Sequence, residues 1–372
     1  MEEIFRKLIA FPTVSGNHQA AHDLLEYVSD FVQARGMHVA RYEWDGYASL
    51  VATVKPGHKT PKVMLAAHAD VVPGGPELFK LRKRGGNYIG RGVVDMKFAL
   101  AAYMQIIDDI KDDTANYDIG LMITADEELG GRSGTAKLVD EGYIPQVCIL
   151  PDGGDNWQIQ TSSKGLWLLE ITANGRTAHG SRPWLGDNAI TKLLAAIQEI
   201  SDLFPAHPHP DTNTMVLSRI DGGEAMNQVP NRASATLDIR TINSDEHARL
   251  YDALVKICRK RKLKHEFVGD AAPTSYSLKD PLIAPFAKLI TEVTAVPVRG
   301  HHALGASDVR FYVPFGIPCI SVYPKGGHLH ADAEWLDIEA FEQFKVITQK
   351  YLEQVAKLPS DKTAAPLLTK AE

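Results

Sequence analysis

The amino-acid sequence predicts an α/β protein: a mostly parallel sheet covered by helices, interrupted by an inserted ferredoxin-like α+β domain. Two observations indicate this fold class. Short apolar segments alternate with helical stretches in the first and last parts of the chain, which is typical of parallel strands buried on both faces. The middle of the chain instead follows the β-α-β-β-α-β order of a ferredoxin-like unit.

The first part of the chain opens with an amphipathic helical region over residues 3–35, because its apolar residues recur at helical spacing. We then expect strands at residues 37–44, 49–54, 63–67, 119–124, 147–150 and 317–322, and a helix at 96–110. Three of these strands end in acidic or histidine residues: His68, the triplet 126–128, and Asp152. Open α/β sheets bind ligands outside the carboxyl ends of their strands, so a site is expected at this edge.

The inserted domain is expected to span residues 166–274, and the discontinuous first domain residues 1–165 and 275–358. Within the insertion we predict strands at 166–173, 213–220, 232–241 and 263–268, and helices at 187–204 and 244–261. The segment from Lys357 on contains Pro, Ser, Lys and Thr, and residues 359–372 are predicted to form a loose tail.

Composition excludes several classes of protein. The 372 residues carry a formal net charge of -6, and this mild acidity does not favour a nucleic-acid partner. No apolar run approaches the ~20 residues of a membrane span, and the first residues do not resemble a signal peptide. The three cysteines are few, odd in number and far apart, which argues against a disulfide framework. We therefore expect a cytoplasmic protein without a membrane or nucleic-acid partner.

The strand-end residues are candidate metal ligands. His68 and Asp70 point to the same side of an extended segment, and a carboxylate beside a metal-bound imidazole fixes its tautomer. Asp95 follows a glycine-rich loop and precedes the helix at 96–110. Each feature also has an alternative explanation when it is considered alone. His68 and Asp70 could be a polar pair at the end of a strand, and Asp95 could cap the N-terminus of the helix.

The triplet Asp126-Glu127-Glu128 is the sharpest local signal, because adjacent carboxylates repel one another unless cations compensate them. A solvated acidic turn is the alternative explanation. Asp152 ends a further strand, Asp155 is either a turn residue or a competing ligand, and His328 and His330 supply a late imidazole. Oxygen and imidazole ligands without thiolate suit zinc, manganese or cobalt. Five ligands, one of them bridging, would hold two such ions.

Six motifs together resemble those of the zinc peptidase and deacylase family that includes glutamate carboxypeptidase, bacterial dipeptidases, aminoacylase, acetylornithine deacetylase and succinyl-diaminopimelate desuccinylase. They are H-A-D-V-V-P, G-R-G-V-V-D-M-K, D-E-E-L-G-G, P-D-G-G, A-H-G-S-R-P and H-A-D-A-E-W. The resemblance extends from about residue 4 to 355 and includes the inserted domain.

The resemblance implies a role for each matching residue. The metal ligands would be His68 and Asp152 on one zinc, Glu128 and His330 on the other, and Asp95 bridging both. Asp70 would support His68, and Glu127 would be the general base. His330 is preferred to His328 because it precedes the Ala-Asp-Ala-Glu stretch that follows the final histidine of the family.

Substrate contacts are implied in the same way. His179 would reach the active site of a partner subunit and stabilise the oxyanion, so the resemblance implies a homodimer formed through the inserted domain, which would also act as a lid. Asn227 and Arg240 resemble the substrate-binding pair, with Arg240 holding a carboxylate. Gly305 and Ser307 lie in a stretch that resembles the pocket loop of the desuccinylases. A surface histidine and a surface ion pair are the alternative explanations for His179 and Arg240.

The predicted function is hydrolysis of amide bonds in dipeptides or carboxypeptidase-type substrates by two zinc ions, with cobalt or manganese as other candidates. Asp at position 152 favours a peptidase, since Glu is commoner there in deacylases of the family, whereas the pocket loop favours an N-acyl-amino-acid deacylase. The stretch 75–84 departs from the family. Many relatives have a Trp and a Pro-Phe pair here, and in this sequence only the Phe, Phe79, is present. Two other classes of function are considered. A metal-free binding protein would not need the complete set of expected ligands that the sequence retains. A two-metal phosphatase or nuclease would need basic patches to bind phosphate, and the sequence lacks them.

Overall fold

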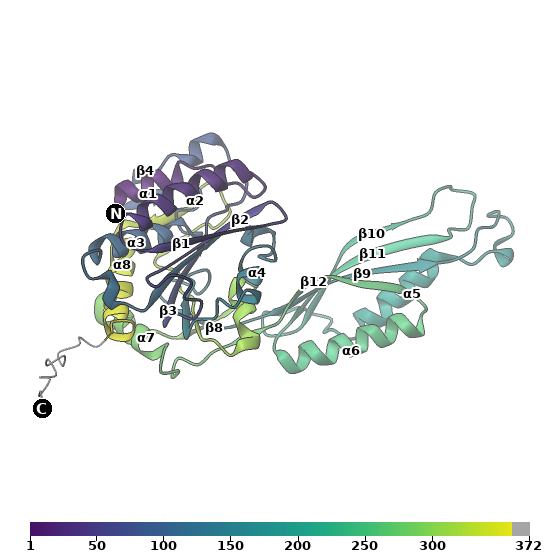
Figure 1. Cartoon of the computed structure of the whole chain (residues 1–372). Coiled ribbons are helices and arrows are strands. Elements are labelled where there is room, and N and C mark those ends of the chain that lie inside the picture. Colours follow the sequence, from purple (N-terminus) through teal and green to yellow (C-terminus); the bar gives the residue numbers. More distant parts are fainter. Residues whose placement is uncertain (359–372) are drawn as a thin grey trace, which may run out of the picture. The chain divides into compact units, whose positions relative to one another are not determined.

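The computed structural model describes residues 1–358, and the tail expected at 359–372 lies outside the described residues. The chain divides into two compact units (Figure 1). Unit 1 comprises Met1–Ile159, Ser277–Arg299 and the chain from Pro314 on, and unit 2 comprises Gln160–Tyr276 and Gly300–Val313. Residues 300–313 thus group with unit 2, whereas the sequence analysis expected them in the first domain.

Unit 1 is built on a six-stranded sheet. Its order is β1 (His38–Trp44), β2 (Tyr47–Thr53), β6 (Ile119–Thr124), β3 (Val63–His68), β7 (Val147–Ile149) and β15 (Cys319–Ile320). Strands β6, β3, β7 and β15 pair in parallel, and β1 and β2 complete one edge in antiparallel fashion. The mostly parallel sheet is therefore confirmed. The strand expected at 317–322 is shorter, with only β15 paired.

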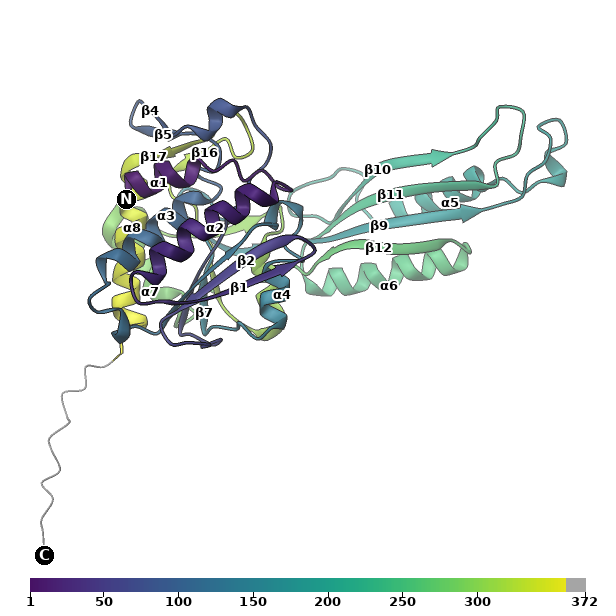
Figure 2. The same cartoon turned by 45° about the horizontal axis from the view of Figure 1, so that its top comes forward.

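Helices cover this sheet. They are α1 (Glu2–Ile9), α2 (His18–Gln33), α3 (Lys97–Asp109), α4 (Thr135–Asp140), α7 (Ala284–Thr294) and α8 (Ile338–Val355). Helix α2 packs on β1 and β2, and α3 packs on β3. In both views α4 lies on the other side of the sheet from α3 and α8 (Figures 1 and 2). The parallel strands are thus enclosed, which explains why their sequences are apolar throughout.

The helical opening expected over residues 3–35 is two helices. Helix α1 ends at Ile9, and α2 begins after Asn17, whose side chain accepts a hydrogen bond from the backbone N–H of Ala20. Pro12 lies between the two helices, and proline interrupts the helical hydrogen-bond pattern. Because the chain is not helical between Ile9 and His18, α1 and α2 are two separate helices of unit 1.

A small antiparallel sheet brings two distant loops together. Its order is β16 (Gly326–Gly327), β17 (Trp335–Asp337), β5 (Asn87–Ile89) and β4 (Arg82–Arg84). The pairing of β17 with β5 places the loop that contains His330 beside the loop that contains Asp95. This is the element of unit 1 that the sequence analysis did not foresee and that matters most for the site.

Unit 2 has the ferredoxin-like order that the sequence predicts. Its elements are β9 (Gly165–Asn174), α5 (Ala189–Ser201), β10 (Thr214–Gly222), β11 (Arg232–Thr241), α6 (Ser244–Lys260) and β12 (Lys264–Ala271). The antiparallel sheet has the order β10-β11-β9-β12, and both helices lie on one of its faces (Figure 2). Alternate residues of β11 are buried, so one face forms a core with α5 and α6. A three-stranded sheet adds β13 (Thr274–Ser275), β8 (Ile159–Ser163) and β14 (Gly300–Ala303).

Three further observations bear on the sequence analysis. Within residues 1–358 no helix combines the length and apolar character needed to cross a membrane. All three cysteines are free and buried. Lys357, where the loose segment was expected to begin, forms an ion pair with Asp113, with 2.7 Å between Nζ and Oδ2.

Candidate metal centre

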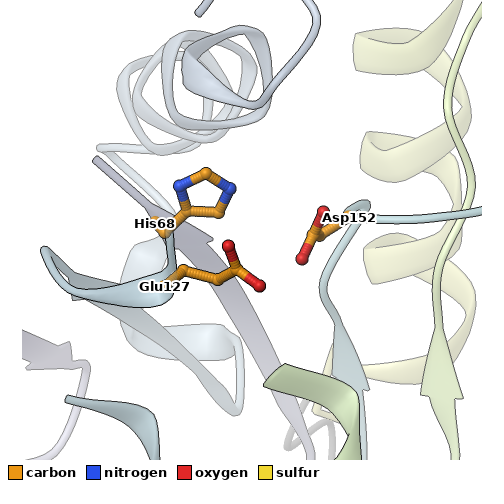
Figure 3. Close-up of side chains that lie close together, drawn as sticks. All are labelled: His68, Glu127 and Asp152. Carbon is orange, nitrogen blue, oxygen red and sulfur yellow. The ribbon is translucent and has the colours of Figure 1, made fainter. Parts of the chain in front are cut away.

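Three neighbouring strands of unit 1 deliver the first group of candidate ligands. Strand β3 ends at His68, a short 3-10 helix after β6 begins at Glu127, and Asp152 follows β7. Because β6, β3 and β7 are adjacent and parallel, their carboxyl ends meet at one edge of the sheet. Figure 3 shows the side chains of His68, Glu127 and Asp152 facing a common space. These side chains thus lie at the edge of the sheet where the sequence analysis expects a site.

Two groups of side chains have the spacing of metal sites. Ligand atoms of His68, Glu127 and Asp152 all lie within 4.8 Å of one another, and so do those of Asp95, Glu128 and His330. Asp95 connects the groups, since its Oδ1 lies 3.2 Å from His68 Nε2 and its Oδ2 lies 3.1 Å from His330 Nε2. His330 rather than His328 belongs to the cluster, and Asp152 rather than Asp155.

The donor set fits a pair of divalent ions. It consists of carboxylate oxygens and imidazole nitrogens without a thiolate, which suits zinc, manganese or cobalt. A carboxylate that touches two histidines through its two oxygens, as Asp95 does, has the geometry of a bridging ligand. The four carboxylates of the two groups would repel one another at this spacing without compensating cations.

Electrostatics within the second group depend on Asp95. Burial alone would raise the pKa of Asp95, but the hydrogen bonds from His330 and His68 lower it below its usual range. Hydrogen bonds to Asp95 and then Glu128 raise the pKa of His330 to about 10. Without a metal the imidazole of His330 is therefore in the positively charged, doubly protonated form at neutral pH. A metal ion that binds the ring must displace one of these protons.

His68 is similarly held in the buried part of the site. Burial favours the neutral ring, yet hydrogen bonds to Asp70 and Asp95 raise the pKa of His68 well above its usual value. Its Nδ1 donates to the backbone oxygen of Asp70 at 3.0 Å and lies 3.5 Å from the Asp70 carboxylate. The other ring nitrogen is thereby turned toward Asp95.

The Asp70 carboxylate also organises the acidic turn. It accepts hydrogen bonds from the backbone N–H groups of Glu127 at 3.2 Å and Glu128 at 3.1 Å, and from the hydroxyl of Ser15 at 3.1 Å. Asp70 therefore connects the strand that carries His68 with the turn that carries Glu127 and Glu128. Asp70, which the resemblance implies as the support of His68, thus lies beside both the His68 ring and the acidic turn.

The first acidic residue of the triplet has a different environment. Asp126 is buried, and its Oδ2 accepts hydrogen bonds from the backbone N–H groups of Ser133 at 2.8 Å and Gly134 at 3.0 Å. It fixes the following loop and belongs to neither metal-ligand group. Of the three adjacent carboxylates, only those of Glu127 and Glu128 face the candidate metal centre.

The sequence analysis missed three residues that support the candidate ligands: Tyr323 and Glu334 contact them directly, and Arg91 pairs with Glu334. The hydroxyl of Tyr323 donates to Asp152 at 2.8 Å and to Asp95 at 3.4 Å, and burial raises the pKa of Tyr323 well above its usual value. Glu334 and Arg91 form a buried ion pair at 3.2 Å, and Glu334 accepts the backbone N–H of Asp95. Both charged residues lie inside motifs that the sequence displays, so their burial was the missing signal.

Two candidate substrate contacts lie together in unit 2. His179 follows β9 and Asn227 follows β10, and the backbone N–H of Gly180 donates to the Asn227 oxygen at 2.6 Å. Both side chains are exposed. The ring of His179 bonds the hydroxyl of Ser181 at 2.8 Å. The structure therefore brings these two loops side by side.

The remaining substrate candidates also belong to unit 2. Arg240, on β11, forms a two-pronged ion pair with Asp238, at 2.7 Å from Nε and 2.9 Å from Nη2. The alternative explanation, a pairing with a nearby acid, thus describes its state here. Gly305 is exposed, and Ser307 is buried with no hydrogen-bond partner for its Oγ among residues 1–358.

The chain is similar to known proteins in sequence and in fold. A family model described as peptidase family M20/M25/M40 matches residues 64–354. The chain is 27% identical to a succinyl-diaminopimelate desuccinylase from Hahella chejuensis, over 96% of this chain and 98% of that protein. It is 28% identical to a "Probable carboxypeptidase" from Aspergillus terreus, over 63% of this chain and 59% of that protein.

The fold is similar to the crystal structure of an M20 family metallo-carboxypeptidase from Sulfolobus solfataricus. The TM-score is 0.75 at 16% identity, with 95% of this chain and 98% of that chain covered. The family expected from the six motifs is confirmed by the model that spans most of the sequence. The protein therefore belongs to peptidase family M20/M25/M40 and is a metal-dependent hydrolase of amide bonds.

Proposed function

We propose that the protein cleaves the peptide bond of small substrates that end in a free carboxylate, such as dipeptides, with two bound zinc ions. His68 and Asp152 would hold one ion, Glu128 and His330 the other, and Asp95 both. The observation that carries the proposal is the pair of ligand groups joined through Asp95, with the Glu127 carboxylate beside them.

Zinc in such a site polarises the carbonyl oxygen and lowers the pKa of water towards ~7. Glu127 is the general base: it takes a proton from the water whose oxygen attacks the carbonyl carbon. It then gives that proton to the leaving nitrogen as the C–N bond breaks. The position of Glu127 in the same 4.8 Å group as His68 and Asp152 supports this role.

Residues of unit 2 would bind and orient the substrate. His179 donates to the oxyanion, and Arg240 and Asn227 hold the carboxylate end. The guanidinium of Arg240 already forms a two-pronged bond with Asp238, and a substrate carboxylate offers the same pair of oxygens. Gly305 and Ser307 would line the pocket, and the buried Ser307 hydroxyl is suited to bind a polar substrate atom.

A second candidate function is removal of an acyl group, such as succinyl or acetyl, from an amino acid. It is favoured by the similarity to the Hahella chejuensis desuccinylase over nearly the full length of both chains. Both candidates use the same metal ligands and the same base, and they differ in the group on the acyl side of the scissile bond.

The test is hydrolysis of a panel of dipeptides, N-acetyl and N-succinyl amino acids, with added zinc and after chelation. Chelator-sensitive release of free amino acids from dipeptides is the expected result. Selective cleavage of one acyl group would establish the second candidate. Cleavage of a phosphate ester instead, or no cleavage by zinc-loaded protein, would contradict both.

We also propose that the protein is a homodimer formed through unit 2, which closes over the substrate as a lid. Strand β10 is at the edge of its sheet, and Val216, Leu217 and Ile220 on it are 59%, 39% and 48% exposed. An apolar edge strand of this kind is a ready surface for a second copy of the chain. In the dimer, His179 would serve the site of the partner.

Subunit mixing tests this arrangement. Variants Glu127→Ala and His179→Ala are each expected to have strongly reduced activity. A mixed dimer should regain activity, since one of its sites has both native residues. No regain after demonstrated subunit exchange would refute a shared site. A cytoplasmic location is part of the proposal and is supported by the three free cysteines; cell fractionation tests it.

A further inference from the structure

The pair formed by Arg91 and Glu334 lies in the interior of unit 1, and each side chain is only 2% exposed. Arg91 follows β5, and Glu334 precedes β17, so the two loops that they belong to are neighbours in the small sheet. Neither residue belongs to the candidate ligand groups. A buried charge pair is weak support for stability in itself, because desolvation offsets much of the attraction.

Glu334 holds the backbone around Asp95. Its Oε1 accepts the N–H groups of Val94 at 2.9 Å and Asp95 at 3.2 Å. Its Oε2 accepts the N–H of Gly92 at 3.0 Å and Nη1 of Arg91 at 3.2 Å. The loop can wrap around the carboxylate partly because Gly92 has a φ of 80°, a conformation that other residues rarely adopt.

Arg91 reaches two further segments of the site. Its Nη1 donates to the backbone oxygen of Ala331 at 3.1 Å, directly after His330. Its Nη2 donates to the backbone oxygen of Pro73 at 3.1 Å, in the segment that follows His68 and Asp70. The guanidinium thus touches the loop of His330 and the segment beyond β3, while Glu334 holds the loop of Asp95.

We infer that the buried Arg91–Glu334 pair is a positioning element that sets the distance between Asp95 and His330 for metal binding. The inference rests on the proposed metal centre. Hydrogen bonds to a metal ligand from residues that do not themselves bind the metal fix the orientation of that ligand. Their loss typically lowers metal affinity about 10- to 100-fold. Here the support acts on the ligand backbone, since Glu334 accepts the N–H of Asp95 itself.

The two ligand groups should depend on the pair unequally. Asp95 and His330 belong to one group with Glu128, and both lie in loops that the pair contacts. The other ion would share Asp95, but its remaining ligands, His68 and Asp152, are placed by strand ends and by Asp70. Loss of Glu334 should therefore weaken the Asp95–Glu128–His330 ion more than its neighbour.

The experiment is a zinc titration of purified full-length protein in competition with a chromogenic chelator. The wild type should bind two ions. Glu334→Ala should lower the affinity for one ion about 10- to 100-fold. Glu334→Gln should lower it less, because its amide oxygen can still accept from Val94 and Asp95. The matched control is Asp332→Asn, since Asp332 lies in the same loop but is 86% exposed and 3.7 Å from Arg91; it should bind zinc as the wild type does.

Circular dichroism and thermal unfolding of the zinc-free proteins show whether each variant is folded at the titration temperature. Folded Glu334→Ala and Glu334→Gln proteins with both wild-type zinc affinities would overturn the inference. Unfolding of both variants would also overturn it, because the pair would then serve stability alone. Failure of the wild-type chain to bind zinc would instead refute the metal centre, and the inference with it.

Discussion

His68 in unit 1 and His179 in unit 2 are both candidate catalytic-site histidines, yet the chain holds them very differently. His68 is 1% exposed, and its two ring nitrogens face Asp70 and Asp95. His179 is exposed, and its ring contacts the nearby Ser181. The first is fixed by its own fold before any ligand arrives, which is what metal binding requires. The second has the freedom expected of a residue that acts on substrate after binding.

The same contrast holds for Asp70 in unit 1 and Arg240 in unit 2. In unit 1, Asp70 accepts three hydrogen bonds and connects the strand that carries His68 with the turn that carries Glu127 and Glu128. In unit 2, Arg240 is bonded to Asp238 two residues away on its own strand. We therefore expect substitutions in unit 1 to affect metal content or chemistry, and substitutions in unit 2 to affect substrate steps with the metal retained.

The largest effect is expected for Glu127→Ala, which should lower kcat up to about 10⁴-fold, since general-base catalysis contributes 10²–10⁴-fold. Zinc content should stay at two per chain, because Glu127 is not one of the five proposed ligands. Steady-state kinetics and metal analysis measure both quantities. Glu141→Gln, which changes an exposed glutamate of the same unit, serves as the control. Retained activity in Glu127→Ala would remove Glu127 from the role of base.

His179→Ala should lower kcat about 10²- to 10³-fold, as expected for loss of one oxyanion donor. Zinc affinity and thermal stability should not change, because the exposed ring supports no part of the metal centre. His207→Ala, at another exposed histidine of unit 2, should have wild-type kcat. A fall in zinc content in His179→Ala would break the contrast between the two units.

Arg240→Ala should raise KM about 10- to 100-fold, because a hydrogen bond to a charged group contributes about 1.5–3 kcal/mol. The effect should disappear for substrates whose terminal carboxylate is amidated, which separates carboxylate binding from general damage. Arg249 is the control: it lies on α6 of the same unit and pairs with Glu246 three residues before it. Equal KM values for Arg240→Ala and Arg249→Ala would place the carboxylate elsewhere.

A more gradual effect, which builds up with each pH unit, concerns the pH dependence of zinc binding. The pKa of His330 is raised to about 10 in the metal-free protein, by Asp95 and then Glu128. Below that pH the ring is protonated, so zinc must displace a proton and its apparent affinity rises with pH. The slope is about tenfold per pH unit for each displaced proton. Calorimetric titrations in buffers of different ionisation enthalpy count the protons released.

His328→Ala provides the control for this measurement, because His328 lies in the same loop but outside the ligand groups. It should release the same number of protons as the wild type. Zinc affinity that is constant with pH between 6 and 9, the range in which a group with a pKa of about 10 stays protonated, would show that His330 is not a ligand.

Local sequence patterns were enough for most of the fold. Apolar runs such as 63–67 and 119–124 became β3 and β6, because continuous burial demands apolar side chains on both faces. The alternating pattern of 232–241 became β11, with one buried face. The break between α1 and α2 was not predicted, since the periodicity on both sides of Pro12 is the same.

By itself the sequence indicated the candidate ligands. His68, the triplet 126–128 and Asp152 come at or shortly after the ends of apolar runs, and the resemblance to the zinc peptidase and deacylase family implied the full set. His68, Asp95, Glu127, Glu128, Asp152 and His330 all lie in the two ligand groups. Only the tertiary structure decided how they are held. Glu334 and Asp95 are 239 residues apart in the chain, and Tyr323 and Asp152 are 171 apart. Contacts at such separations depend on which strands pair and which loops become buried, and no local pattern encodes them.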